Sequence, residues 1–271
     1  MNKFLSIAGG AALALSATAA SAQDTLRIGT EGAYPPYNFT DASGNLVGFE
    51  IELGKEICER TGMTCEFVAQ NWDGIIPALQ NGRYDAIMAG MSITEERKQQ
   101  IDFTQGYITT PAWFVASADS ELQQAETIEQ VREALSDVTV GVQVSTIHQN
   151  FLQEEIPDAE LKLYETQDLL NLDLAAGRVD VGLADSSAWE PFLGSEEGAG
   201  FAQFGPGLTG DDFPIFGEGV GIGLRQDDDE LEAKLNQALC EIKQDGTMTA
   251  LATEWFGYDI AMAPKEGVCQ G

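Results

Sequence analysis

The spacing of apolar residues in the first part of the chain predicts strands that alternate with helices. Apolar runs bounded by Gly and Pro indicate buried strands at residues 26–30, 65–69 and 84–91. Apolar residues spaced three or four apart among charged ones indicate helices at residues 49–60, 72–80 and 94–101. This order predicts an α/β domain with a mainly parallel sheet.

The same alternation restarts near residue 113. It predicts strands at 113–118, 138–144, 161–164 and 179–184, and helices at 127–135, 146–155 and 167–176. Residues 177–181 (Gly-Arg-Val-Asp-Val) echo residues 82–86 (Gly-Arg-Tyr-Asp-Ala), which indicates two lobes of similar construction. Residues 194–221 are rich in Gly, Pro and Asp and are predicted to form a loop or crossover, followed by helices at 229–244 and up to Phe256.

The first 22 residues differ in composition from the rest of the chain. Lys3 precedes a run rich in Ala and Leu that ends in Ala20-Ser21-Ala22, the small-x-small pattern of a signal-peptide cleavage site. A transmembrane anchor is the alternative, but the run is short and Ala-rich. We therefore expect a cleaved signal peptide at residues 1–22 and, because no Cys lies near the cut, no lipid anchor.

The charge of the chain is strongly acidic, with 44 Asp and Glu against 14 Lys and Arg and a net charge of −30. Such a surface repels phosphate backbones, so a nucleic-acid partner is not expected. The charge would attract cationic solutes at low salt, but it also suits an adaptation to saline surroundings and does not locate a site. The acidic run at 227–230 could bind a metal; we interpret it as a helix start, where acids suit the helix dipole.

Four cysteines are expected to form disulfides, because the chain is predicted to be secreted and the number is even. Three pairings are possible, and the short local loop favours Cys58 with Cys65. Cys240 and Cys269 would then join the tail to a helix. No metal site is expected, since no Cys-x-x-Cys occurs and His148 is the only histidine.

Motifs in a specific order extend over nearly the whole chain after residue 22. They lie at residues 29–39, 48–53, 72–79, 84–88, 92–97, 102–104, 140–143, 176–180, 219–223 and 245–247. The first reads Gly-Thr-Glu-Gly-Ala-Tyr-Pro-Pro-Tyr-Asn-Phe. In these motifs the chain resembles the family 3 extracellular solute-binding proteins of polar amino-acid ABC transporters, in particular the lysine/arginine/ornithine, histidine and opine binders.

The resemblance implies a type II periplasmic binding protein, an α/β fold of two similar lobes joined by two hinge strands. Lobe one would comprise residues 23–109 plus 215–271 and lobe two residues 112–212, with hinges near 109–112 and 208–217. The ligand would lie between lobes that close by hinge motion. The resemblance also implies an amino-acid ligand, an inner-membrane ABC permease as partner, a periplasmic monomer, no cofactor and no catalytic residues.

For the carboxylate of an amino acid, the resemblance implies Arg97 as a clamp, with Ser92 beside it. A guanidinium makes two parallel hydrogen bonds to a carboxylate. From the residues alone, Arg97 could equally be a surface side chain paired with neighbouring glutamates. The helix start at Thr146 would add free N–H groups. There the chain departs from the family, which usually has Gly and a hydroxyl residue where this chain has Ser145 and Ile147.

For the α-ammonium, the resemblance implies Asp185 together with the backbone at Gly90. A helix N-cap is the alternative role for Asp185, because two serines follow it. Ala89 stands where relatives often have Ser, so one polar contact is missing. His148 stands where some relatives have a polar contact residue, although a solvated helix residue is an equal interpretation.

For the ligand side chain, the resemblance implies an acidic partner at Glu31, because a cation in a dry cleft needs one. Tyr34 and Trp72 would wall the slot and stack on an alkyl or guanidinium group, with core packing as the alternative for Trp72. Gln143 would add a polar contact from lobe two. These residues favour arginine, lysine, ornithine or histidine, while an opine or glutamine stays open.

Two other functions fit the same scaffold. A dehydratase acting on arogenate or prephenate would need a general acid in the cleft, which Glu31 could supply. A sensory protein would bind the same ligand and signal to a separate partner. The amino-acid clamp argues against the dehydratase. The chain carries no kinase or membrane segment after residue 22, so a sensory role would need another protein.

Overall fold

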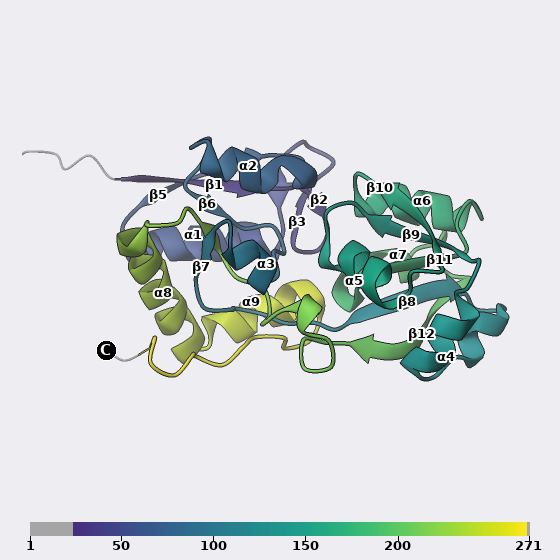
Figure 1. Cartoon of the computed structure of the whole chain (residues 1–271). Coiled ribbons are helices and arrows are strands. Elements are labelled where there is room, and N and C mark those ends of the chain that lie inside the picture. The colour runs from purple at the N-terminus through teal and green to yellow at the C-terminus, as the bar shows by residue number, and fades with distance from the viewer. Residues whose placement is uncertain (1–23, 270–271) are drawn as a thin grey trace, which may run out of the picture.

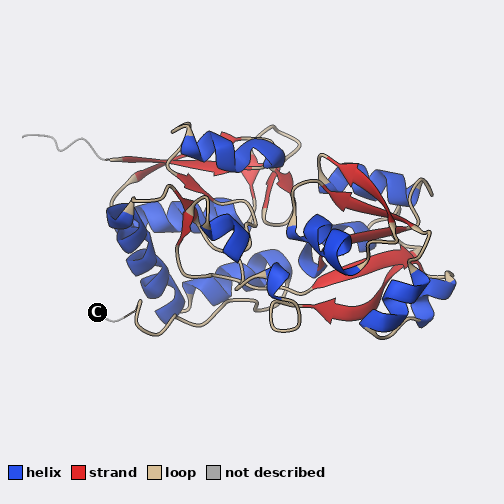
Figure 2. Ribbon diagram, viewed as in Figure 1, coloured by secondary structure: helices blue, strands red, loops and turns tan. Residues whose placement is uncertain are grey.

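The computed structural model describes residues 24–269, so the predicted signal peptide at residues 1–22 lies outside the described part. Two lobes lie side by side, each built on a five-stranded sheet with helices on both faces (Figure 1, Figure 2). The predicted α/β fold with two similar lobes is confirmed. Among residues 24–269, none of the helices has the length and apolar character that crossing a membrane requires.

Lobe one is the part of the chain built on the sheet β5-β1-β6-β13-β7. Its strands are β1 (Thr25–Thr30), β5 (Thr64–Ala69), β6 (Ala86–Ile87), β7 (Asp102–Phe103) and β13 (Gly223–Leu224). Its helices are α1 (Phe49–Thr61), α2 (Ile75–Gln80), α3 (Glu95–Lys98), α8 (Asp229–Gln244) and α9 (Thr247–Phe256). β1 is parallel to β5 and β6, whereas β13 is antiparallel to β6 and β7.

Lobe two is built on the sheet β10-β9-β11-β8-β12. Its strands are β8 (Ala112–Ser117), β9 (Thr139–Gln143), β10 (Glu160–Tyr164), β11 (Val181–Asp185) and β12 (Phe201–Leu208). Its helices are α4 (Ile128–Ala134), α5 (Ile147–Glu155), α6 (Gln167–Ala175) and α7 (Ser186–Leu193). β9 is parallel to β10 and β11, and β8 runs antiparallel to its two neighbours.

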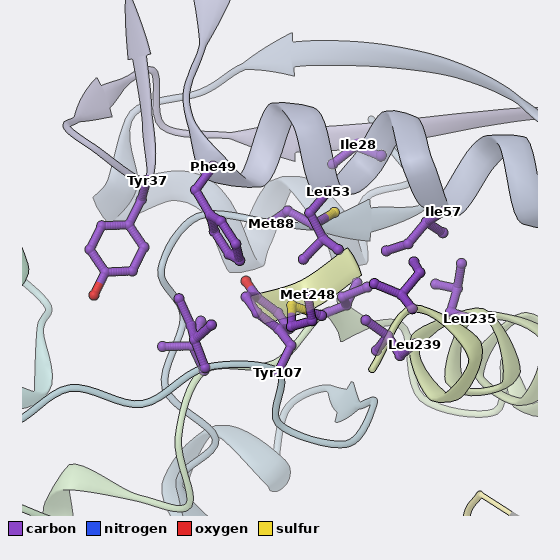
Figure 3. Close-up of a cluster of buried hydrophobic side chains, with 14 of the residues drawn as sticks. Ile28, Tyr37, Phe49, Leu53, Ile57, Met88, Tyr107, Leu235, Leu239 and Met248 are labelled. Atoms are coloured by element: carbon purple, nitrogen blue, oxygen red, sulfur yellow. The ribbon is translucent and has the colours of Figure 1, made fainter. Parts of the chain in front are cut away.

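The apolar face of α1 shows how the pattern of the sequence builds the core of lobe one. Phe49, Leu53 and Ile57 recur every four residues, so they lie on one face of the helix. This face packs with Leu235 and Leu239 of α8 in one buried cluster (Figure 3). Helix α8, near the C-terminus, therefore belongs to the same lobe as the first strands of the chain.

The chain crosses between the lobes twice, once between β7 and β8 and once between β12 and β13. The first crossover, between β7 and β8, lies between two other segments of the chain. Val220 pairs with Ile108 as an antiparallel bridge, and Ala261 pairs with Ile108 on the other side. The C-terminal tail thus lies beside the first crossover.

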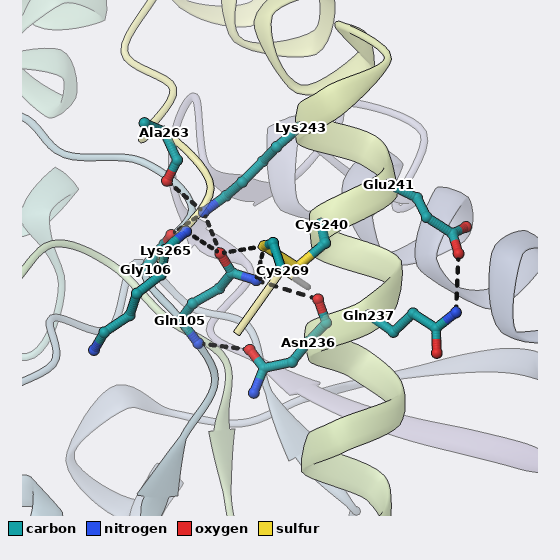
Figure 4. Close-up of a disulfide and its surroundings, with 10 residues drawn as sticks. All are labelled: Gln105, Gly106, Asn236, Gln237, Cys240, Glu241, Lys243, Ala263, Lys265 and Cys269. Carbon is teal, nitrogen blue, oxygen red and sulfur yellow. Dashed lines mark hydrogen bonds between the residues drawn. A yellow bond between two sulfur atoms is a disulfide. The ribbon is translucent and has the colours of Figure 1, made fainter. Parts of the chain in front are cut away.

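Both predicted disulfides are present, with Cα–Cα distances of 5.8 Å for Cys58–Cys65 and 5.3 Å for Cys240–Cys269. The second bond ties the tail to α8, as expected (Figure 4). The acidic run at 227–230 leads into α8, whose first turn carries Asp229 and Glu230, as the helix-start interpretation predicted.

Several structural features were not predicted, among them the two-residue strands β7 and β13. Residues 33–47 form a small antiparallel sheet of β2 (Ala33–Tyr34), β3 (Asn38–Thr40) and β4 (Leu46–Val47). Helix α7 was not expected, and its Pro191 lies inside the helix. β12 lies in the predicted loop; it contains Gly205 and Pro206 and has an irregular register, which an edge strand tolerates.

Candidate functional site

The cleft between the lobes contains a cavity that is lined by residues of both lobes. All ten residues predicted to bind the ligand line this cavity, together with Ala89 and Ile147. Its lining consists of Glu31, Tyr34, Trp72, Ala89, Gly90, Ser92, Arg97, Gln143, Thr146, Ile147, His148 and Asp185. The structure therefore brings the predicted residues together, while their contacts with a ligand stay predictions.

Sheet topology explains why these residues meet. Glu31 directly follows β1, and Gly90 lies shortly after the parallel strand β6. Gln143 ends β9, and Asp185 ends the parallel strand β11. The carboxyl ends of parallel strands lie at one edge of a sheet, which is where open α/β sheets bind ligands. Each lobe turns that edge toward the cleft.

Arg97 is a buried cation and not a surface side chain. It lies in the short helix α3, where the Thr94 side chain accepts a hydrogen bond from the Arg97 N–H at 3.2 Å. Its side chain is 8 % exposed, its Nη1 donates to the Ser92 carbonyl at 3.0 Å, and its guanidinium lies 5.1 Å from the Trp72 ring centroid. Burial lowers the pKa of Arg97 to about 10. This value is still well above 7, so the guanidinium is cationic at neutral pH.

The N-terminus of α5 lines the same cavity as Arg97. Thr146 is its N-cap, accepting from the Gln149 N–H at 3.2 Å and donating to the Gln143 carbonyl at 2.7 Å. Ser145 has φ 60, in the left-handed region that favours glycine. Its carbonyl accepts a hydrogen bond from the Trp72 indole at 3.1 Å.

Asp185 and His148 are neighbours in the part of the cavity wall that lobe two provides. Asp185 occupies the N-cap position of α7, but its side chain makes no capping hydrogen bond. It accepts a hydrogen bond from the Tyr34 hydroxyl at 2.6 Å, and its Oδ1 lies 3.6 Å from His148 Nε2. The interpretation of His148 as a solvated residue is wrong, because it is 5 % exposed; its Nε2 has no hydrogen-bond partner among the described residues.

Glu31 is a buried carboxylate with one polar partner from the other lobe. Gln143 Nε2 donates to Glu31 Oε1 at 2.7 Å and to the Glu165 carbonyl at 3.1 Å. Burial raises the pKa of Glu31 to about 7, and the hydrogen bond from Gln143 opposes this rise. The charges of Asp168 and Glu50 raise the pKa further. A cation beside Glu31 would relieve this desolvation and repulsion.

Several of these hydrogen bonds join the two lobes. Tyr34 with Asp185, Gln143 with Glu31 and Trp72 with Ser145 all pair a lobe-one residue with a lobe-two residue. At the rim, Asn150 Nδ2 donates to Glu96 Oε2 at 2.9 Å. The structure therefore shows the closed arrangement of the cleft.

Sequence analysis missed two contributors to this site. Ile147 was noted only as a departure from the family, yet it provides an apolar wall of the cavity. Glu50 was not singled out at all, although it lies directly behind Gly90. The sequence carried no signal for it, because an acid in the first turn of a helix is an ordinary feature.

A cleft between two α/β lobes, with a buried guanidinium and carboxylates from both lobes in its wall, defines a binding protein for a small charged solute. The sequence profile of the bacterial extracellular solute-binding proteins, family 3, matches residues 26–258. The chain belongs to this family.

Individual relatives agree with this assignment. The chain is 37 % identical to an L-arginine-binding protein of Pseudomonas aeruginosa over 262 residues, covering 95 % of this chain and 98 % of the relative. It is 37 % identical to a lysine/arginine/ornithine-binding periplasmic protein of Escherichia coli, covering 94 % and 96 %. A periplasmic His/Glu/Gln/Arg/opine family-binding protein from Silicibacter pomeroyi, solved in complex with lysine, is 40 % identical with a TM-score of 0.75, covering 88 % and 99 %.

Proposed function

We propose that this protein is the solute-binding component of an amino-acid ABC importer and that its ligand is a basic amino acid. One observation carries the proposal: the cavity holds the buried cation Arg97 together with the carboxylates Asp185 and Glu31. A basic amino acid has one carboxylate and two cations and complements this set. The names of the relatives, which include arginine, lysine and ornithine binders, support the same ligand class.

In this proposal Arg97 and the N–H groups at the start of α5 bind the ligand carboxylate, with Ser92 beside them. Asp185 and the Gly90 backbone bind the α-ammonium. Glu31 pairs with the distal cation, and Gln143 orients the Glu31 carboxylate. The remaining wall is formed by Tyr34, Trp72, Ala89, Ile147 and His148.

The same proposal includes the organisation and location of the chain. We infer lobes at residues 23–109 plus 215–271 and at 112–212, with hinges near 109–112 and 208–217. The protein acts in the periplasm as a monomer after removal of residues 1–22, without a lipid anchor, and delivers its ligand to an inner-membrane ABC permease. The periplasmic names of the relatives support this location.

A catalytic role is not part of the proposal. A general acid with a pKa near neutrality would suit a dehydratase, and Glu31 has such a pKa. However, the relatives reported above are solute-binding proteins, and Arg97 and Asp185 provide the clamp that a free amino acid needs. We expect no turnover of prephenate or arogenate by the purified protein in a spectrophotometric assay.

Thermal unfolding tests the proposal. The ligand-stripped protein without residues 1–22 is heated with arginine, lysine, ornithine, histidine, glutamine or octopine. At about 100 times Kd, a true ligand adds roughly 2.7 kcal/mol of stability, which raises Tm by several degrees. We expect this shift with a basic amino acid, abolished by Glu31→Gln and unchanged by the exposed control Glu133→Gln.

Other results would decide against parts of the proposal. A shift with glutamine alone would overturn the role of Glu31 but keep the binding protein. A shift with no compound would overturn the transport function, and turnover of prephenate would then favour the enzyme.

A further inference from the structure

Glu50 is a buried acid that the proposed ligand contacts do not use. It lies in the first turn of α1 and is 0 % exposed. Its Oε1 accepts hydrogen bonds from the Gly90 N–H at 2.8 Å and from the Tyr107 hydroxyl, and its Oε2 accepts from Asn38 Nδ2 at 2.7 Å. No basic side chain pairs with it among the described residues. A fully desolvated acid with this set of partners needs an explanation.

The partners of Glu50 are arranged for a carboxylate anion. The amide orientation of Asn38 follows from its other contact, because Asn38 Oδ1 accepts from the Gly32 N–H at 2.8 Å and its NH₂ group must therefore face Glu50. Donors thus reach both oxygens of Glu50, and the N-terminus of α1 adds a favourable dipole. Burial raises the pKa of Glu50 above its ordinary value, and the hydrogen bonds from Tyr107, Gly90 and Asn38 oppose part of this rise.

The contacts of Glu50 fix three segments around the cleft. Gly90 lines the cavity, and Gly32, held through Asn38, directly follows Glu31. Tyr107 belongs to the first crossover and lies in the core beside α1 (Figure 3). One carboxylate therefore connects two ligand-facing loops with a segment on which lobe rotation depends.

The Gly90 peptide is the most direct link to the ligand. Gly90 has φ 62, and a Cβ there would meet the Tyr34 ring at 3.4 Å. Its N–H points toward Glu50, so the carbonyl of the same trans peptide, that of Ala89, points the opposite way. Since Tyr34 also bonds Asp185, this peptide lies beside the position that we assign to the α-ammonium.

We propose that Glu50 is a positioning residue for ligand recognition, which orients the Gly90 peptide and adds a buried negative charge behind the α-ammonium. This inference rests on the proposed binding of a basic amino acid. It assigns part of the preference for the ammonium to a side chain that the ligand does not touch. Charge at this depth acts over several ångströms because the surroundings are dry.

Paired ligands separate this role from a purely structural one. Titration calorimetry compares arginine with 5-guanidinopentanoate, and lysine with 6-aminohexanoate; the second compound of each pair lacks the α-ammonium. In Glu50→Gln, we expect the preference for the amino acid over its analogue to fall about tenfold relative to wild type. Glu50→Asp should restore part of this preference, and Tyr107→Phe, which leaves the charge in place, should retain most of it.

Two results would contradict this inference. If Glu50→Gln binds both members of a pair with unchanged ratio, whatever its Tm, the inference is wrong while the proposed function stands. If the wild-type protein binds neither amino acid, the proposed function fails and this inference with it.

A measurement on the wild-type protein covers the case in which Glu50→Gln does not fold. The ¹³C shift of the Glu50 carboxyl, in protein labelled at its glutamate side chains, reports ionisation directly. We expect an ionised carboxylate at pH 7 with and without ligand. A protonated Glu50 in the complex would overturn the proposal.

Discussion

The charges that line the cleft are unbalanced until a cation enters it. The carboxylates Glu31 and Asp185 share the cavity with one guanidinium, that of Arg97, and Glu50 lies directly behind it. Buried like charges raise the free energy of the empty closed state. A ligand with one carboxylate and two cations removes this excess, which is why a neutral amino acid should close the lobes less well.

Glu31 should make ligand affinity depend on pH. Burial raises its pKa to about 7 in the empty cleft, and only the ionised form pairs with the distal cation of a basic ligand. We therefore expect the affinity for a basic amino acid to fall below pH 7, by up to about tenfold per pH unit. Calorimetric titrations between pH 5.5 and 8.5 measure this. Glu31→Gln, titrated at higher ligand concentration because it binds more weakly, should lose the part of the pH dependence that Glu31 causes.

The same residue should make the ligand-free protein less stable at high pH. The pKa of Glu31 in the folded protein lies above its value of 4.5 in the unfolded chain, so its stabilising contribution is present below about pH 4.5 and is lost as the pH rises through about 7. Glu31→Gln should therefore raise the free energy of unfolding by about 1 to 3 kcal/mol at pH 8 and have little effect near pH 4.5. Urea unfolding of both proteins at the two pH values measures this difference. If Glu31→Gln changed the free energy of unfolding equally at pH 8 and pH 4.5, the expected pH dependence would be wrong.

At the scale of elements, the C-terminal tail acts as an added strand beside the first crossover. The Thr109 N–H donates to the Ile260 carbonyl at 3.1 Å, and the Met262 N–H donates to the Tyr107 carbonyl at 2.9 Å. Lys243 Nζ donates to the Gly106 carbonyl at 2.6 Å, next to the Cys240–Cys269 disulfide (Figure 4). The disulfide keeps this tail in place.

Removing each disulfide should therefore have different effects. Chain entropy gives about 3.6 kcal/mol for the 29-residue separation of Cys240 and Cys269, against about 2.4 kcal/mol for the 7-residue separation of Cys58 and Cys65. We expect Cys240→Ser with Cys269→Ser to destabilise more than Cys58→Ser with Cys65→Ser in urea unfolding. Only the former should speed amide hydrogen exchange at residues 107–109. Equal exchange at these residues in both variants would show that the tail does not support the crossover.

At the scale of the whole molecule, contacts between the lobes decide how well the closed state competes with an open one. Asn150 and Glu96 are not part of the cavity lining, so the Asn150 side chain can be removed without removing a residue of the site. Lobe closure is a hinge motion whose equilibrium the ligand shifts.

Asn150→Ala should weaken binding of a basic amino acid by about two- to fivefold, the effect of losing one exposed hydrogen bond of the closed state. Gln153→Ala, on the same helix, is the matched control and should leave Kd unchanged. Small-angle X-ray scattering of the wild-type protein should show a smaller radius of gyration with ligand. If both variants bind like wild type, the rim contact contributes nothing to closure.

Local patterns in the sequence predicted most of the helices and strands. The period of apolar positions predicted α1, α8 and the β1–β5–β6 core, because burial on one face imposes that period whatever the fold. The resemblance that the motifs carry named every polar residue of the cavity lining, whereas the residues by themselves left structural alternatives open for Arg97, Trp72 and Asp185. The short spacing favoured Cys58 with Cys65 among three possible pairings, and the structure contains this disulfide and the one between Cys240 and Cys269.

Tertiary structure alone decided what these residues face. Gln143 meets Glu31, and Tyr34 meets Asp185, only because two separately folded lobes close on each other, and no local pattern records that distance. β12 was hidden because its Gly and Pro are tolerated at a sheet edge. Glu50 looked like an ordinary acid of a helix start; its burial arises from partners that three distant segments bring to it.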